Sequence, residues 1–358
     1  MSNKIHVMQM IDSLSIGGAE RVSVNYANAL SEENGYMSFH CATREEGMLK
    51  SFLLPEVNYF FMNKKSLFDR KSYFKLVKYI KNNKIDIIHA HSSSFFTAVI
   101  VKLFTGVKIV WHDHYGKAES IEDRPLLPLQ IGSLFFSQII SVNNILKSWA
   151  QEKLFLNKDK ILYLPNYADL KFDTTVPNLP GEKGKRIVLL ANLRPQKDHL
   201  TMLKAFSKVI ESGYKDWVLL LVGRDWNDTY SDSIKEQLNE NTFILGGRSD
   251  TAQILKACDI GVLSSVSEGL PVALLEYALA SLAVVVTAVG ECDTVVNKGD
   301  AGLVVPAGDD KKLSDSLIRL ISDIAFRKDI AKRFSQYVDE NYSKESAMKE
   351  IRKVYSRI

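Results

Sequence analysis

The sequence of 358 residues has three cysteines, and no two of them form a Cys-x-x-Cys pair. Such a scattered, odd-numbered set indicates reduced thiols rather than a disulfide framework, and therefore a cytoplasmic protein. No run of 18 apolar residues is present, and the first residues lack the apolar core of a signal peptide. We therefore expect no membrane-spanning helix.

Strong charge of one sign is missing as well. Lys and Arg number 46 against 42 Asp and Glu, a net charge of +4, which argues against a nucleic-acid-binding protein. The excess is uneven, because residues 1–180 hold 21 basic and 17 acidic side chains and the remainder is balanced. Between residues 60 and 85, eight basic side chains accompany a single acid, Asp69. The eight are Lys64, Lys65, Arg70, Lys71, Lys75, Lys78, Lys81 and Lys84.

This basic segment 60–85 has two interpretations. A run of cations is usually a solvated helix face. Alternatively, the segment docks on an anionic membrane or a lipid phosphate, where each cation contributes about 1 kcal/mol. Phe68, Tyr73 and Phe74 interleave with the charges, as an interfacial segment requires. The second interpretation places the protein peripherally at the inner face of the cell membrane.

Short apolar runs alternate with amphipathic helical patterns along the chain, which predicts an α/β protein with parallel sheets. Strands are expected at residues 5–11, 85–89 and 108–111, and the pattern restarts with a strand at 187–190. Residues 165–186 contain three prolines and two glycines, which is typical of a linker. Two α/β domains are therefore predicted, with ligands beyond the carboxyl ends of their strands.

Two short segments could bind phosphate. Gly17 and Gly18 follow the first strand and precede a helix that begins near Ala19, so a phosphate could approach the backbone and the helix start closely. A plain tight turn is the alternative, and the absence of Gly-x-Gly-x-x-Gly excludes a dinucleotide fingerprint. Arg194 and Lys197 follow the first strand of the second half, where they could neutralise a diphosphate leaving group or simply occupy a solvated loop.

Two glutamates are candidates for binding sugar hydroxyls. Glu268 lies in a predicted loop, and Glu276 lies about one turn into the next helix. Carboxylates bind paired hydroxyls through two hydrogen bonds, while Gly269 and Leu270 offer backbone amides near the helix start. A capping glutamate and a surface glutamate are the alternatives, but the apolar helix around Glu276 favours a functional role because burying an acid is costly.

Two His-x-His runs, His89-Ala-His91 and His112-Asp-His114, end predicted strands. Residues at positions i and i+2 share a strand face, so each run could present two imidazoles together. Metal binding, with Asp86 and Asp113 nearby, is one interpretation. Substrate-binding or catalytic histidines and a merely polar strand end are the others.

The order of these motifs resembles that of the family 4 glycosyltransferases over nearly the whole chain. Its most specific part is the pair of glutamates separated by seven residues. The motifs that carry the resemblance are Gly17-Gly18-Ala19-Glu20-Arg21, Asp86-Ile-Ile-His89-Ala-His91, Trp111-His112-Asp-His114, Pro165-Asn166, Arg194-Pro-Gln-Lys197-Asp198, Val222-Gly223, Ser267-Glu268-Gly269, Glu276 and Gly302-Leu-Val-Val-Pro306.

The resemblance implies a GT-B fold, in which two Rossmann-like domains face each other across a cleft and the C-terminal helix returns to the first domain. It implies a retaining transferase that moves a hexose or N-acetylhexosamine from a nucleotide sugar, expected to be a UDP-sugar, to a glycan or lipid-linked acceptor in surface polysaccharide or lipopolysaccharide assembly. No cofactor and no obligatory metal are implied. The expected parts are an acceptor-side domain (1–170), a linker (171–186), a donor-binding domain (187–340) and the returning helix (341–358).

The resemblance also implies roles for individual residues. His112, Lys197 and Glu268 would be catalytic, with Lys197 neutralising the diphosphate. Donor binding would involve Gly17, Gly18, Arg194, Lys197, Glu268, Gly269, Leu270 and, at the ribose, Glu276. The possible acceptor-side residues are His89, His91 and His114, and His114 is the fallback for His112.

The sequence departs from the family pattern in three places, and rival activities stand beside the one that the resemblance implies. The stretch Ala191-Asn192-Leu193 stands where the family often has Gly-Arg-Leu, which puts the role of Arg194 in doubt. Tyr167 follows Pro165-Asn166 where the family usually has glycine, and Asp293 stands where it often has glutamate. A GT-B sugar-nucleotide epimerase, a metal-dependent hydrolase that uses the His-x-His runs, and a non-catalytic nucleotide-sugar-binding partner are the alternatives.

Overall fold

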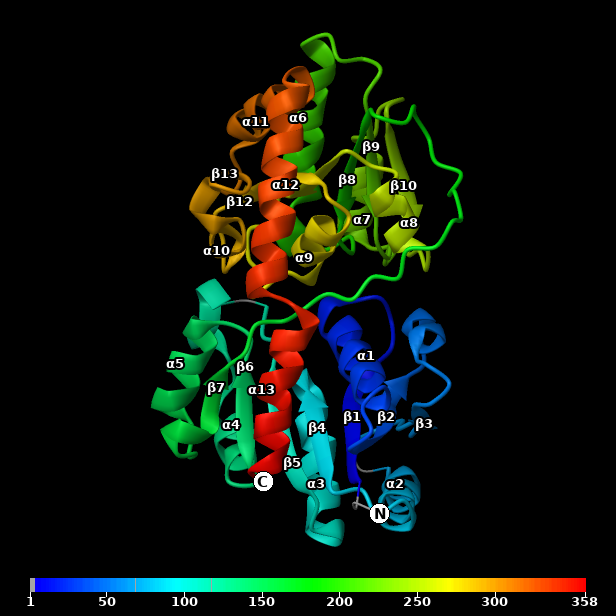
Figure 1. Cartoon of the computed structure of the whole chain (residues 1–358), viewed down its shortest axis with the longest axis vertical. Coiled ribbons are helices and arrows are strands. Elements are labelled where there is room, and N and C mark those ends of the chain that lie inside the picture. Colours follow the sequence, from blue (N-terminus) through cyan, green and yellow to red (C-terminus); the bar gives the residue numbers. More distant parts are fainter. Residues whose placement is uncertain (1–3, 68, 117) are drawn as a thin grey trace. The chain divides into compact units, whose positions relative to one another are not determined.

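The computed structural model describes residues 4–67, 69–116 and 118–358. The chain divides into two units, each with its own parallel sheet (Figure 1). Unit 1 consists of Met1–Asn166 and Lys344–Ile358, and unit 2 consists of Tyr167–Ser343. The C-terminal helix therefore belongs to unit 1 although it follows unit 2 in the sequence, which confirms the expected return of this helix to the first domain.

Within the described residues, the sheet of unit 1 has seven strands in the order β3-β2-β1-β4-β5-β6-β7, and all neighbours are parallel. Its core follows the doubly wound Rossmann pattern. The strands are β1 (Ile5–Ser13), β2 (Tyr36–Glu45), β3 (Asn58–Phe61), β4 (Ile87–His91), β5 (Lys108–Asp113), β6 (Gln138–Ser141) and β7 (Ile161–Tyr163). The helices are α1 (Gly18–Ser31), α2 (Arg70–Asn82), α3 (Phe95–Thr105), α4 (Leu126–Ser133), α5 (Asn144–Lys153) and α13 (Lys344–Ser356). The 3-10 turns are Met48–Phe52, Ser92–Ser94, Ala118–Asp123 and Lys158–Lys160.

The sheet of unit 2 has six described strands in the order β10-β9-β8-β11-β12-β13, again all parallel. The strands are β8 (Arg186–Leu190), β9 (Val218–Val222), β10 (Thr242–Gly246), β11 (Ile260–Leu263), β12 (Ala283–Thr287) and β13 (Leu303–Val305). The helices are α6 (His199–Glu211), α7 (Thr229–Lys235), α8 (Thr251–Lys256), α9 (Val272–Leu279), α10 (Cys292–Val295), α11 (Asp310–Ser322) and α12 (Ile324–Asn341). The 3-10 turns are Pro195–Lys197 and Asn297–Gly299.

Burial on both faces of each sheet explains the continuous apolar runs of the sequence. Every residue of β9 and of β12 is buried, and in unit 1 the central strands contribute fully buried side chains such as Met8, Ile88 and Ile109. Burying one such side chain contributes about 1.5–3 kcal/mol. No helix in the described part of the chain has the combination of length and apolar character needed to cross a membrane.

The strand predicted at 85–89 is in fact β4, displaced by two residues toward the C-terminus. Asp86 lies before the strand, where its carboxylate accepts a hydrogen bond from His6 N at 2.8 Å. His89 and His91 belong to the strand and are fully buried. The apolar pattern alone misplaced the boundary because the polar rings at the strand end are satisfied by hydrogen bonds.

Parallel strands bring the loops that follow them to one edge of each sheet. In unit 1 this carboxyl edge carries the segments after β1, β4 and β5. In unit 2 it carries the segments after β8, β11 and β12. The glycines, histidines, lysine and glutamates of the candidate site lie on or after these strands, and open α/β sheets bind ligands at this edge.

Candidate active site

In unit 2, Lys197 and Glu268 form an ion pair at the carboxyl edge of the sheet. Lys197 ends the 3-10 turn that follows β8, and Glu268 lies between β11 and α9. The distance between Lys197 Nζ and Glu268 Oε1 is 2.5 Å, and Ser265 Oγ donates to the same oxygen at 2.6 Å. The side chain of Glu268 is 6% exposed and that of Lys197 is 19% exposed. Removing one of the two charges would therefore leave the other poorly compensated.

Contacts to the main chain hold the two loops of this ion pair together. Ser264 Oγ donates to the carbonyl oxygen of Lys197 at 2.9 Å. Gly290, with φ of +53°, comes so close that a Cβ atom would overlap the carbonyl oxygen of Glu268. Only glycine adopts this left-handed conformation without strain and leaves that space empty. The position of the ion pair is therefore set by the backbone.

Gly269, Leu270 and Glu276 surround the start of α9 at the same edge. Gly269 and Leu270 precede the helix, and its N-cap residue, Pro271, supplies no capping side chain. Glu276 lies one turn into the helix and is buried. The positive end of a helix dipole favours anions. This region therefore combines a carboxylate, which can accept hydrogen bonds from hydroxyl groups, with a helix start, which can bind a phosphate.

Tyr277 fixes α9 against the sheet. Its hydroxyl accepts a hydrogen bond from Leu190 N at 2.6 Å and donates to the carbonyl oxygen of Val262 at 3.1 Å. Burial raises the pKa of this phenol, so it remains a neutral donor. Glu276, its neighbour in the sequence, is thereby held at a defined position relative to β8 and β11.

Arg194 is directed elsewhere. Its side chain is exposed, and its guanidinium lies 5.1 Å from the centre of the Trp226 ring, while Arg224 lies 3.9 Å from the same centre. Lys197 points to Glu268 instead. The structure thus brings Lys197 and Glu268 into direct contact. Arg194, although close to Lys197 in the sequence, contacts the ring of Trp226 instead.

In unit 1, four histidines stack at the carboxyl edge of the sheet. The ring centres of His89 and His91 are 4.6 Å apart, and those of His112 and His114 are 4.1 Å apart. His91 pairs with His112 in the register of β4 and β5. The two His-x-His runs therefore share one face, as their i, i+2 spacing predicts.

The four imidazoles form neutral hydrogen-bonded pairs. His89 Nε2 lies 3.1 Å from His112 Nδ1, and His91 Nδ1 lies 2.9 Å from His114 Nε2. Burial lowers the pKa of all four rings, and the neighbouring histidines lower it further at His89, His91 and His112. The pKa of His89 and that of His114 fall to about 3. These rings therefore act as neutral donors and acceptors at neutral pH.

His89, His91 and His112 also have the ligand types of a metal site, with ring nitrogens within 4.8 Å of one another. Both nitrogens of His89 and both of His91 already take part in hydrogen bonds to side chains. Of the six nitrogens, only His112 Nε2 has no partner among the residues that the structure describes. A metal would have to displace most of this network, so the arrangement favours hydrogen bonding.

The two carboxylates suggested as helpers of a metal lie elsewhere. Asp113 is 1% exposed and binds both terminal nitrogens of Arg124, each at 2.7 Å. Asp86 lies at the amino end of β4, at the opposite edge of the sheet from the histidines. Their positions give no support to the metal interpretation.

Gly17 and Gly18 form the start of α1, as expected, with Gly17 as its N-cap residue. The carboxylate of Glu20 folds back over Gly17, where it would overlap a Cβ atom. A carboxylate at this position uses the positive end of the helix dipole that a phosphate would also use. Diphosphate binding at Gly18 therefore requires Glu20 to turn away.

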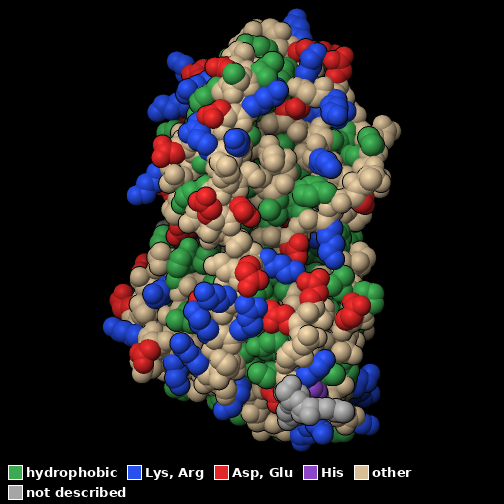
Figure 2. All heavy atoms as spheres, in the orientation of Figure 1, with side chains coloured by type: hydrophobic (Ala, Val, Ile, Leu, Met, Phe, Trp, Pro, Cys, Tyr) green, Lys and Arg blue, Asp and Glu red, His purple; other side chains and the backbone are tan. Residues whose placement is uncertain are grey.

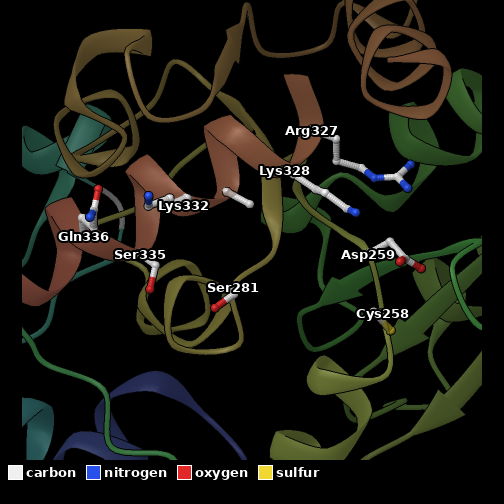
Figure 3. A pocket seen from close by; sticks show the side chains of 9 residues that line it. Cys258, Asp259, Ser281, Arg327, Lys328, Lys332, Ser335 and Gln336 are labelled. Atoms are coloured by element: carbon white, nitrogen blue, oxygen red, sulfur yellow. The ribbon is translucent and has the colours of Figure 1, made fainter. Parts of the chain in front are cut away.

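A cavity of about 440 Å³ in unit 2 lies away from all these residues. Arg327 and Lys328 of α12 line it together with Asp259 and Ser281 (Figure 3). Asp259 directly precedes β11, and its carboxylate accepts a hydrogen bond from Arg186 N at 3.0 Å. The cavity thus lies at the amino edge of the sheet, opposite the candidate active site.

Sequence reasoning missed three side chains that contact the site residues. Ser265 binds Glu268, and its position three residues earlier in a polar loop was a usable signal. Gln9 binds His91 and stands out as the polar residue within the apolar run of residues 7–11. Tyr355 binds His89 across 266 residues of sequence, so no local pattern could identify it.

Two Rossmann-like units with these loops define the GT-B fold. Anabaena HepE, solved in complex with UDP and glucose, has this fold. It matches with a TM-score of 0.80 at 17% identity, over 98% of this chain and 99% of that one. The family model Glycosyltransferase Family 4 matches residues 16–172, and the model Glycosyl transferases group 1 matches residues 184–323. The chain belongs to the family 4 glycosyltransferases, which confirms the resemblance and favours sugar transfer over an epimerase, a hydrolase or a non-catalytic partner.

Two curated relatives are similar over most of their length. The first is the UDP-Gal:alpha-D-GlcNAc-diphosphoundecaprenol alpha-1,3-galactosyltransferase of Escherichia coli, 29% identical over 89% of this chain and 88% of the relative. The second is the N,N'-diacetylbacillosaminyl-diphospho-undecaprenol alpha-1,3-N-acetylgalactosaminyltransferase of Campylobacter jejuni, 27% identical over 76% and 78%.

Proposed function

We propose that this enzyme transfers a hexose or N-acetylhexosamine from a UDP-sugar, with retention, to a saccharide carried on a polyprenyl diphosphate during surface polysaccharide assembly. The observation that carries this proposal is the ion pair between half-buried Lys197 and buried Glu268, at the same sheet edge as Glu276. The named activities of the Escherichia coli and Campylobacter jejuni relatives support the donor and acceptor classes.

In the proposed reaction, an acceptor hydroxyl attacks the anomeric carbon of the donor while the bond from that carbon to the diphosphate oxygen breaks. The hydroxyl proton passes to an oxygen of the departing diphosphate, so attack and departure occur on the same face of the sugar. Negative charge grows on the diphosphate in the transition state. Lys197 stabilises that charge more than it stabilises the bound donor, which is the condition for faster turnover.

Each remaining site residue has a role that suits its position. Glu268 exchanges part of its contact with Lys197 for a hydroxyl of the donor sugar, and Glu276 binds the ribose. The amides of Gly269 and Leu270 bind phosphate or sugar oxygens at the start of α9. His112, in unit 1, donates a hydrogen bond to a substrate oxygen from its neutral ring. No metal takes part in this scheme.

A panel of UDP-, GDP- and ADP-sugars tests the donor. We expect calorimetry to detect a UDP-hexose or UDP-N-acetylhexosamine, and we expect slow hydrolysis of that donor without acceptor. Adding a diphosphoundecaprenol-linked N-acetylglucosamine should convert hydrolysis into transfer, with no loss in the presence of a chelator. Binding of no nucleotide sugar, or transfer abolished by the chelator, would contradict the proposal.

We also propose that unit 1 docks on an anionic membrane through α2 and the neighbouring helices. α2 packs against α3, and α3 against α4. Lysines on and next to α2 are exposed, and Lys and Arg side chains gather around this helix in Figure 2. The exposed lysines are Lys71, Lys75, Lys78, Lys81 and Lys84. Apolar side chains on the same helices are also exposed, namely Phe74, Phe96, Leu103, Phe104, Leu127 and Ile131.

The structure removes two residues of the basic segment 60–85 from the candidate docking surface. Lys64 is buried, and its ammonium donates to Thr97 Oγ1 at 2.6 Å, so it does not contribute to a surface charge. Tyr73 packs against the core of unit 1, which leaves Phe74 as the exposed aromatic of α2. Phe68 lies outside the described residues.

Cosedimentation with vesicles tests the docking. Replacing Lys75, Lys78 and Lys81 with Gln should weaken binding to anionic vesicles about 100-fold and leave neutral vesicles unaffected. The control carries the same charge change on exposed lysines of unit 2: Lys183, Lys215 and Lys311. Equal binding of the two triple variants, or binding that does not depend on anionic lipid, would contradict docking through α2.

A further inference from the structure

A chain of hydrogen bonds links the C-terminal helix to the candidate active-site histidine of unit 1. Gln9 Nε2 donates to the hydroxyl of Tyr355 at 3.2 Å. The same hydroxyl lies 2.6 Å from His89 Nδ1, and His89 Nε2 lies 3.1 Å from His112 Nδ1. All four side chains are buried, and the chain ends at His112 Nε2, whose environment contains no partner from the described residues.

The polarity of this chain follows from counting hydrogens. A phenol carries one hydrogen, so Tyr355, which accepts from Gln9, donates its own hydrogen to His89 Nδ1. A neutral imidazole also carries one, which places the hydrogen of His89 on Nε2 and directs it to His112 Nδ1. The hydrogen of His112 then lies on Nε2. Burial raises the pKa of Tyr355 and lowers that of both histidines, so all three groups stay neutral.

A second branch starts from the other end of the same amide. Gln9 Oε1 lies 2.8 Å from His91 Nε2, and His91 Nδ1 lies 2.9 Å from His114 Nε2. Because an amide oxygen accepts, His91 carries its hydrogen on Nε2, and His114 donates from Nε2 in turn. One amide orientation therefore sets the tautomers of four histidines, and the reversed amide would move all four hydrogens to Nδ1.

We propose that Gln9 and Tyr355 are positioning residues that hold His112 as the Nε2–H tautomer, so that it donates to an acceptor oxygen of the substrate such as a sugar hydroxyl. This inference rests on the proposed function for its substrate and on unit 1 alone for its geometry. It also assigns a role to α13 beyond covering the sheet. This helix carries the Tyr355 hydroxyl, through which Gln9 sets the direction of the hydrogen bonds to His89 and His112.

Tautomers can be read directly, without any substrate. Long-range proton–nitrogen correlation spectra of protein labelled with nitrogen-15 in its imidazole rings, near neutral pH, show which ring nitrogen carries the hydrogen. We expect Nε2–H at His89, His91, His112 and His114. Finding Nδ1–H at His112 in the unmodified protein overturns the proposal.

Tyr355→Phe removes the hydroxyl and keeps the ring, and Tyr36→Phe is its control because that ring packs against Tyr355 at 6.1 Å. We expect Tyr355→Phe to populate the Nδ1–H form of His112 and to lower kcat about tenfold or more, with KM for the donor little changed. The control should change neither. Gln9→Leu should disturb both branches, and Tyr355→Phe decides the matter if that variant fails to fold.

The outcomes separate this inference from the proposed function. If His112 stays Nε2–H in Tyr355→Phe and kcat is unchanged, the positioning role is wrong while transfer by the unmodified enzyme stands. If the tautomer of His112 shifts as expected in Tyr355→Phe but the unmodified enzyme transfers no sugar, the positioning role is supported and the proposed function is wrong.

Discussion

The carboxyl edges of the two sheets share a topology but not a chemistry. In unit 1 the edge is built from neutral imidazoles that donate and accept among themselves. In unit 2 it is built from an ion pair between a half-buried lysine and a buried glutamate. The difference suits two kinds of binding: fixed charge stabilises an anionic leaving group, whereas neutral rings recognise oxygen atoms by the direction of a hydrogen. The four predictions below test this contrast, from the largest expected effect to the smallest.

Acid should destabilise unit 1 far more than unit 2. Burial lowers the pKa of His40, His89 and His114 to about 3, and it also lowers that of His91 and His112. In unit 2 it lowers the pKa of His199 to about 4. Below about pH 6.5 the unfolded chain binds protons that the folded chain does not bind. Each such histidine therefore contributes its full share to the free energy of unfolding above that pH. As the pH falls below it, this free energy decreases by about 1.4 kcal/mol per pH unit for each such histidine.

Amide hydrogen exchange between pH 7.5 and pH 5 measures this difference region by region. We expect protection to be lost first in the strands of unit 1. His40 is not part of the hydrogen-bond network of the other four histidines. His40→Leu should therefore reduce the change of the unfolding free energy of unit 1 with pH by the contribution of about one histidine. Earlier loss of protection in unit 2 would contradict the contrast.

Removing the positive charge of Lys197 in unit 2 should have the next largest effect, which is on turnover. Lys197→Met is expected to lower kcat roughly 100- to 1000-fold, because one preorganised charge on the leaving group is lost. It should also cost stability, because Glu268 remains buried without its partner. The double variant Lys197→Met/Glu268→Gln should recover stability without recovering turnover. Diphosphate release at the normal rate in Lys197→Met would contradict the role of Lys197.

The fold was largely predictable from the sequence because strands buried on both faces appear as continuous apolar runs, as in β9 and β12. The exception is instructive. β4 extends to His91, and a rule based on apolar character ends it too early because it cannot register that buried imidazoles bind one another.

The candidate site was predictable only where its residues are neighbours in the sequence or belong to a known motif. The spacing of Glu268 and Glu276 and the placement of Lys197 after a strand could be read directly. Sequence reasoning could not predict that Lys197 binds Glu268, that Glu20 covers Gly17, or that Tyr355 reaches His89. These contacts depend on how separate segments meet in three dimensions.

Glu276 tests the donor half of the contrast at a smaller scale. Glu276→Gln should weaken UDP and UDP-sugar binding about 10- to 100-fold, because a charge-assisted hydrogen bond to the ribose becomes a neutral one. Glu236→Gln makes the same charge change at an exposed position and should leave affinity unchanged. Calorimetry measures both. If UDP binds both variants equally, the ribose contact is wrong and the buried Glu276 serves the packing of α9.

The smallest expected effect concerns the surface of unit 1 and a single acid. Asp69 caps α2 by accepting hydrogen bonds from the backbone and the hydroxyl of Ser72, at 3.2 and 2.8 Å. Asp69→Asn keeps a capping oxygen and removes the one negative charge of the basic segment. If α2 docks on an anionic membrane, this variant should bind anionic vesicles about fivefold more tightly. Cosedimentation measures the change, and Asp216→Asn, at an exposed position in unit 2, is its control. Equal binding by the two variants would mean that the charge asymmetry of the chain serves solvation, and that the contrast between the units is confined to their sheet edges.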